Sequence, residues 1–106
     1  MTNLEYLKSI AQRKQAVDDK ENDLKYQIAQ RREWLEGNRT SPKVAQWKQE
    51  MAQLQQRYVD EPERETADLC REIQQQRGIT DVFTRNTAAV HERENAEQWA
   101  KHMLGL

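Results

Sequence analysis

The chain has 106 residues, of which 33% are charged, and its formal net charge at pH 7 is -1. This length leaves room for one modest domain and excludes a catalytic domain joined to a separate regulatory one. The 18 leucine, isoleucine, valine and phenylalanine residues fall below the fifth of a chain that usually fills a globular core, but they recur periodically. We therefore expect long helices around a thin core rather than disorder.

One cysteine, Cys70, is present, so no disulfide can form within the chain. Residues 1–10 include Glu5 and lack the apolar run of a secretory signal. The longest purely apolar run is the three residues from Ala88 to Val90, far short of the roughly 20 that span a bilayer. We therefore expect a cytoplasmic protein without a membrane-spanning segment.

The first predicted helix begins near residue 3, because Thr2 and Glu5 have the spacing of a capping box. Its apolar positions form a heptad-like series, which consists of Leu7, Ile10, Val17, Leu24, Ile28 and Leu35. Lys14 and Glu21 interrupt this series. We expect both to be solvated, the alternative being that they pair with charges on a facing helix and fix its register. Gly37 is placed to end the helix with a positive φ.

The second predicted helix begins at Ser41, which can act as an N-cap, with Pro42 in the first helical position. One face of this helix carries an apolar stripe, which consists of Val44, Trp47, Met51, Leu54 and Tyr58. Trp47 lies at the centre of this stripe and is expected to be core. Because the turn between the two helices is short, they should form an antiparallel hairpin.

Pro62 interrupts the helical pattern, because proline lacks a backbone donor and disfavours helical geometry at the preceding Glu61. The D-x-x-E pattern from Asp60 to Glu63 favours a break, with a third helix from about residue 61 to Arg77. A proline kink within one long helix is the alternative. Gly78 is the expected stop.

Two further segments follow towards the C-terminus. The short apolar cluster from Ile79 to Phe83 fits either a turn or the start of another helix. From about Thr87 the spacing of alanine, tryptophan and methionine residues predicts a last helix that Gly105 closes.

These elements predict an all-α fold, with an antiparallel hairpin of two long helices and one or two shorter helices packed on it in a coiled-coil-like bundle. No stretch has the alternation of a strand. We expect a single domain over residues 1–106, divided into a long-helix hairpin (1–58) and C-terminal helices (59–106). Because the apolar stripe of the second helix faces an interrupted series on the first, we also expect a homodimer.

Candidate catalytic residues are few. Cys70, His91 and His102 are the obvious nucleophile or metal ligands, but a zinc site needs three or four such ligands at local spacings that the chain lacks. The carboxylates between Asp60 and Glu72 are expected to form a solvated face. We therefore expect no enzyme activity, no cofactor and no metal.

The predicted turn between the long helices carries the strongest candidate site. Four basic residues surround a tryptophan there, and the set consists of Arg31, Arg32, Trp34, Arg39 and Lys43. Trp34 falls about 100° from Leu35 around the helix, which places it off the apolar stripe. Tryptophan and arginine dominate protein interfaces, whereas basic and aromatic side chains together also bind nucleic acids. Trp34 capping the end of the bundle is the third alternative.

We therefore expect a protein-protein interaction module that binds through its helical faces and the hairpin tip. It would be an adaptor, an assembly factor or a small inhibitor of the kind that phages or mobile elements carry. The alternative is an accessory protein that binds nucleic acid through the basic segment from Arg31 to Lys48.

Overall fold

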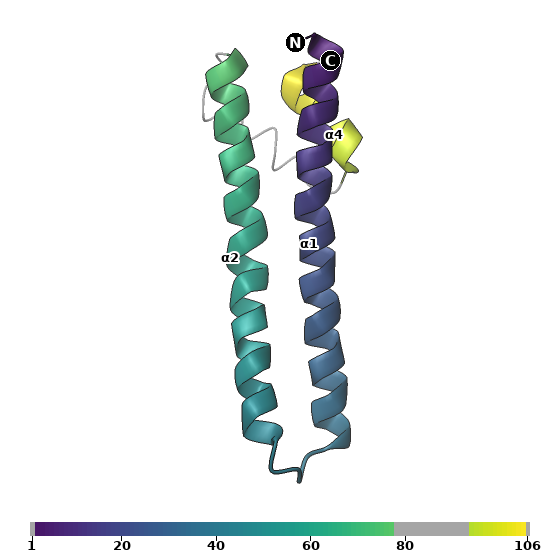
Figure 1. Ribbon diagram of the computed structural model, residues 1–106, viewed down its shortest axis with the longest axis vertical. Helices are drawn as coiled ribbons and strands as arrows, with labels where there is room; N and C mark the ends of the chain where they lie inside the picture. Colours follow the sequence, from purple (N-terminus) through teal and green to yellow (C-terminus); the bar gives the residue numbers. More distant parts are fainter. Residues whose placement is uncertain (1, 78–93, 106) are drawn as a thin grey trace.

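The computed structural model describes residues 2–77 and 94–105, and these residues form three helices and no strand. Helix α1 (Asn3–Gly37) and helix α2 (Val44–Arg77) run antiparallel, and the short helix α4 (Ala96–Leu104) packs beside them at the end away from the turn (Figure 1). The molecule is a rod with extents of 57 × 22 × 22 Å. The predicted all-α hairpin with a shorter helix packed on it is confirmed.

The two ends of α1 are capped by polar side chains. The Thr2 hydroxyl accepts a hydrogen bond from the Glu5 backbone N–H at 3.2 Å, as predicted. At the other end, Gly37 is the last helical residue and does not have a positive φ, so that prediction is wrong. Asn38 ends the helix instead, because its side-chain amide donates to the Trp34 carbonyl at 2.7 Å and its backbone N–H donates to the Leu35 carbonyl.

The start of α2 depends on Ser41. Its hydroxyl accepts the backbone N–H of Lys43 at 3.2 Å, and its carbonyl accepts the N–H of Val44 at 3.2 Å. Regular helix begins at Val44, slightly later than the predicted start at Pro42. Ser41 therefore caps the helix as expected, through a first turn that is tighter than an α-helix.

Pro62 lies inside α2, which continues unbroken to Arg77, so the predicted break is wrong. The second arm of the hairpin is consequently longer than the predicted limit at residue 58. The physical reason is a clamp across the proline: Lys20 of α1 pairs with both Glu61 and Glu65, at 3.1 and 2.8 Å. The proline ring is also buried. Together these contacts hold α2 against α1 before and after the position where the proline removes a backbone hydrogen bond. The helix reaches the predicted end at Arg77, where this described stretch of the chain also stops.

Helix α4 begins at Ala96. Its N-cap is Asn95, whose side chain accepts the backbone N–H of Gln98 at 2.8 Å, and residues 94 and 95 are not helical. Gly105 closes the helix with a φ of 73°, as expected. The predictions for Gly78, for the cluster from Ile79 to Phe83 and for the helix start near Thr87 lie outside the described residues.

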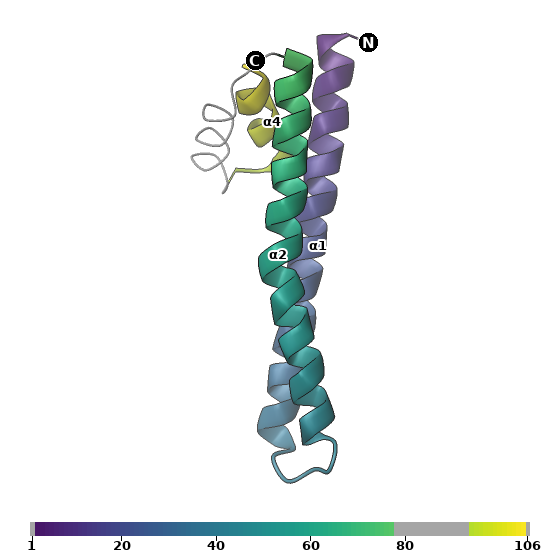
Figure 2. The same ribbon diagram turned by 90° about the vertical axis from the view of Figure 1, so that its left-hand side faces the viewer.

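The main core joins all three helices at the end away from the turn, where α4 covers one side of the hairpin (Figure 2). Trp99 of α4 is fully buried at its centre. Its other buried members are Leu7, Ile10, Leu69, Cys70, Ile73, Ala100, Met103 and Leu104. Nearer the turn, a smaller cluster of Leu24, Ile28 and Leu54 is flanked by half-buried Met51 and Tyr58. Most of the apolar burial therefore lies beneath α4.

Lys14 is buried in this core, with 6% of its surface exposed, so the prediction that it is solvated is wrong. Its ammonium pairs with Asp18 at 2.5 Å and lies 5.4 Å from the ring centroid of Trp99. The covering helix α4 explains the difference, because the lysine stem packs under an indole whose ring attracts the cation. Glu21, the second interruption, is half-buried.

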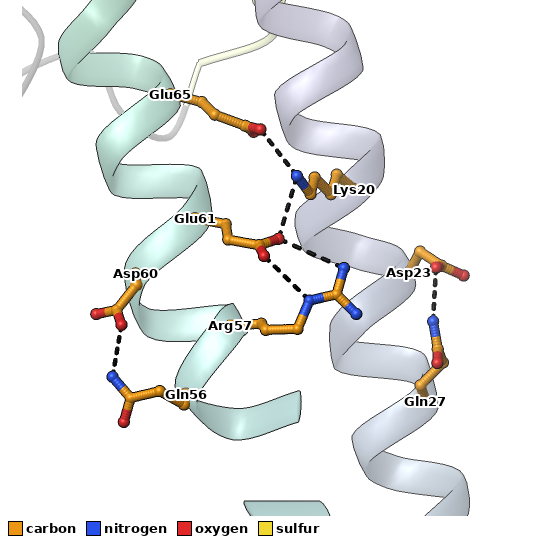
Figure 3. A network of polar contacts seen from close by, with 8 residues as sticks. All are labelled: Lys20, Asp23, Gln27, Gln56, Arg57, Asp60, Glu61 and Glu65. Carbon is orange, nitrogen blue, oxygen red and sulfur yellow. Dashed lines mark hydrogen bonds and ion pairs between the residues drawn. The ribbon is translucent and has the colours of Figure 1, made fainter. Parts of the chain in front are cut away.

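A polar network joins the long helices at their middle (Figure 3). Besides its contacts with Lys20, Glu61 accepts from the Arg57 guanidinium of its own helix at 3.1 Å. Hydrogen bonds to Arg57 and then to Lys20 hold the pKa of Glu61 below its ordinary value. The hydrogen bonds from Lys20 to Glu65 and Glu61 raise the pKa of Lys20. The network therefore favours the charged forms of Glu61 and Lys20 and fixes the register of α1 against α2.

Candidate functional site

The two tryptophans near the turn stack on each other across the hairpin. The ring centroids of Trp34 on α1 and Trp47 on α2 lie 4.2 Å apart, and the ring planes differ by 7°. Both side chains are half-buried. Trp34 therefore faces α2, and its predicted position off the packing face is wrong. Trp47, which is expected to be core, is only half-buried and belongs to neither of the described core clusters, which lie farther along the rod.

Arg31 lies behind this pair of indoles. Its guanidinium carbon is 5.7 Å from the ring centroid of Trp47, and its Nη1 donates to the Gln27 carbonyl at 3.3 Å. Its Nε forms an ion pair with Glu50 of α2 at 3.6 Å. The side chain is only 24% exposed. Arg31 thus helps to hold the tip together, and much of its charge is balanced by Glu50.

The other three predicted site residues are exposed. Arg32 follows Arg31 on α1, whereas Arg39 lies in the turn and Lys43 directly precedes α2. The hydrogen bonds of Asn38 and Ser41 fix the backbone of this turn. The result is a partly exposed stacked indole pair near the end of the rod, with three exposed cations close to it in the chain.

The tip therefore brings Arg31 and Trp34 together with two residues that were not predicted as part of the site, Trp47 and Glu50. A signal for the tryptophan pair exists in the sequence. Trp34 and Trp47 each lie four residues outside the turn of residues 38–43, and equal distances from an antiparallel turn place residues at the same level. The same register places Glu50 of α2 opposite Arg31 of α1.

The other candidate residues have structural surroundings. Cys70 lies in the main core, and burial raises the pKa of its thiol, although the positive charge of Lys14 opposes the shift. The His102 ring pairs with Glu94 at 2.5 Å, and His91 lies outside the described residues. Among residues 2–77 and 94–105, no group of three or more histidine, cysteine or acidic side chains is placed to hold a metal ion.

None of the described helices contains a stretch that is both long and apolar enough to cross a membrane. No protein-family model, no curated protein and no solved structure matches the chain.

Proposed function

We propose that this protein is a protein-protein interaction module without catalytic activity, and that its partner docks on the hairpin tip. An adaptor, an assembly factor or a small inhibitor of the phage or mobile-element kind fits this role. The observation that carries the proposal is the partly exposed stack of Trp34 and Trp47 at the end of a long rod. Tryptophan and arginine are the side chains that contribute most to interface hot spots.

The contacts within the tip support this proposal. The stack, the Arg31 contact with Glu50 and the capped turn restrain the side chains and the backbone of this surface. A preorganised surface loses less side-chain entropy on binding. Exposed Arg39 and Lys43 at the rim would attract an acidic partner and orient it, whereas the indoles would supply the buried contact.

The basic tip also supports the alternative of nucleic-acid binding. Five basic and two acidic residues lie in the segment 31–48, and exposed cations bind phosphates. Two contacts weigh against it: Trp34 and Trp47 stack on each other, which occupies one face of each ring, and Arg31 is already paired with Glu50. Base stacking needs open aromatic faces.

Affinity capture from a lysate of the native host, carried out with and without nuclease treatment, tests the proposal. The baits are the wild-type chain, the tip variant Arg39→Glu/Lys43→Glu, and a control variant with two charge reversals on exposed residues outside the tip, Lys8→Glu/Arg64→Glu. We expect the wild type and the control to enrich the same protein, and the tip variant to lose it.

Two outcomes would contradict the protein-binding role of the tip. The first is enrichment of the same protein by the tip variant, which would place the contact elsewhere. The second is material that nuclease removes and whose binding falls steeply with salt, which is typical of phosphate contacts. That result would favour the nucleic-acid alternative.

A further inference from the structure

The half of the hairpin near the turn lacks the cover that α4 provides at the other end (Figures 1 and 2). Beneath α4, Leu69 and Ile73 of α2 are 2% and 0% exposed. The same stripe continues along α2 through Pro62 to Tyr58, Met51 and Val44, and these last three residues are half-buried. None of the described helices covers this side, so within the described part of the chain an apolar surface is left open along this half of the rod.

A second apolar row lies next to this stripe on α2. It consists of Ala45, Ala52 and Val59, which are spaced seven residues apart and are all exposed, with Val59 at 61%. Spacing of seven residues keeps side chains on one face of a helix and is the signature of helix-helix packing. Contact with α1 does not use this row. The apolar face of α2 is thus wider than the hairpin needs.

The charges along the rod indicate how a second copy would lie against this surface. Segment 31–48 at the tip contains five basic and two acidic residues, whereas segments 18–23 and 57–65 at the middle contain eight acidic and three basic residues. An antiparallel neighbour places the basic tip of each chain beside the acidic middle of the other. A parallel neighbour would instead place like charges together.

Glu21 and Arg32 supply a specific contact in such a pair. Glu21 is half-buried and Arg32 is exposed, both lie on α1, and neither has a hydrogen bond or ion pair with any of the described residues. Their midpoint along α1 lies between Leu24 and Ile28. This is the level of the small apolar cluster that includes Leu54 of α2.

We propose that two copies of this chain associate antiparallel through this open side, with a twofold axis at the level of Leu54. The symmetry brings Arg32 of each copy next to Glu21 of the second copy, and it brings Met51 close to Tyr58 of the second copy. The two hairpins then form a four-helix bundle over the half that α4 leaves open. The inference concerns the side of the hairpin and does not depend on the function proposed for its tip.

The test is a charge exchange measured by sedimentation. Wild-type protein should sediment at micromolar concentration with twice the chain mass of 12.6 kDa. Because the contact occurs twice in the dimer, the single variants Arg32→Glu and Glu21→Lys should each weaken association by about tenfold or more. An equimolar mixture of the two variants should recover the dimer, since both contacts again join opposite charges. Lys8→Glu, on an exposed residue near the N-terminus, is the charge control.

A second pair of variants tests the apolar row. Ala52→Lys should abolish association, whereas Ala67→Lys, which changes an exposed alanine of α2 outside the row, should leave it unchanged. Helical content must be retained in every variant. A wild-type chain that stays monomeric overturns the proposal. The proposal is equally overturned if the mixture of charge variants fails to regain the dimer, or if the single charge variants associate like the wild type. None of these results bears on capture of a partner by the tip.

Discussion

Removal of either tip tryptophan should destabilise the hairpin, and the two effects should be coupled. Truncating a fully buried tryptophan costs about 3 to 5 kcal/mol. Because Trp34 and Trp47 are partly exposed, each change to alanine should lower the free energy of unfolding by less than this, by roughly 2 to 3 kcal/mol. Trp47→Ala should be the more harmful change, since it also removes the contact with Arg31, which is worth about 0.5 to 1 kcal/mol.

The coupling energy measures the stacking itself. Aromatic pairs in such geometry contribute about 0.5 to 1.5 kcal/mol beyond their burial. The double variant should therefore be less destabilised than the sum of the two single variants by that amount. Urea denaturation followed by far-ultraviolet circular dichroism gives each free energy, and it reports the helices rather than the indoles.

An exposed aromatic residue provides the matched control for this cycle. Tyr26 lies on α1 about 12 Å from Trp34 by helix rise and is 62% exposed. Tyr26→Ala should combine additively with Trp34→Ala, to within about 0.5 kcal/mol. The stacked tip would be refuted if the effects of the two tryptophan changes were additive to within about 0.5 kcal/mol. It would also be refuted if Trp34→Ala were as stable as the wild type.

Three further changes test the rest of the rod. Pro62→Ala should stabilise the protein by roughly 1 kcal/mol, because a gain of about 3 kcal/mol in helix propensity exceeds the lost ring burial and the greater freedom of the unfolded chain; urea denaturation measures the change. Lys14→Ala should cost about 1 to 3 kcal/mol through lost packing and cation contact in the core, whereas the exposed control Lys8→Ala should stay within about 0.5 kcal/mol. Glu61→Gln should reduce the loss of stability in acid. Because the pKa of Glu61 is depressed in the folded protein, the contribution of Glu61 to stability is complete above the unfolded pKa. This contribution disappears as pH falls through the folded pKa. Lys20 has the opposite sign: its raised pKa makes a contribution that is complete below the unfolded pKa and is lost as pH rises through the folded pKa.

Each of these predictions has a clear contrary result. A loss of stability in Pro62→Ala would mean that the proline ring is worth more in place than a regular helix would be. Equal effects of the two lysine changes would mean that Lys14 is not part of the core. Parallel stability curves of the wild type and Glu61→Gln between neutral and acidic pH would remove Glu61 from the charge network.

The local rules of helix formation determined much of this fold directly from the sequence. Thr2, Ser41 and Gly105 act at helix ends as expected, because a cap depends on a few neighbouring backbone groups. The antiparallel hairpin also follows from the sequence, since two long amphipathic helices with a short connection have few other ways to bury their stripes. The approximate position of the tip and its cations required nothing more.

Contacts between distant segments decided the rest. The sequence pattern favoured a break at Pro62, but Lys20 lies 41 residues before Glu61 and pairs on both sides of the proline. The position of Lys14 in the apolar series of α1 predicts a solvated side chain, but in the structure Trp99 of α4 covers it. The angle between Trp34 and Leu35 on one helix predicts a surface position for Trp34, whereas its neighbour in the structure is Trp47 of the other helix. Local pattern fixes which residues share a helical face, but only the register and packing of a second helix decide whether that face is covered.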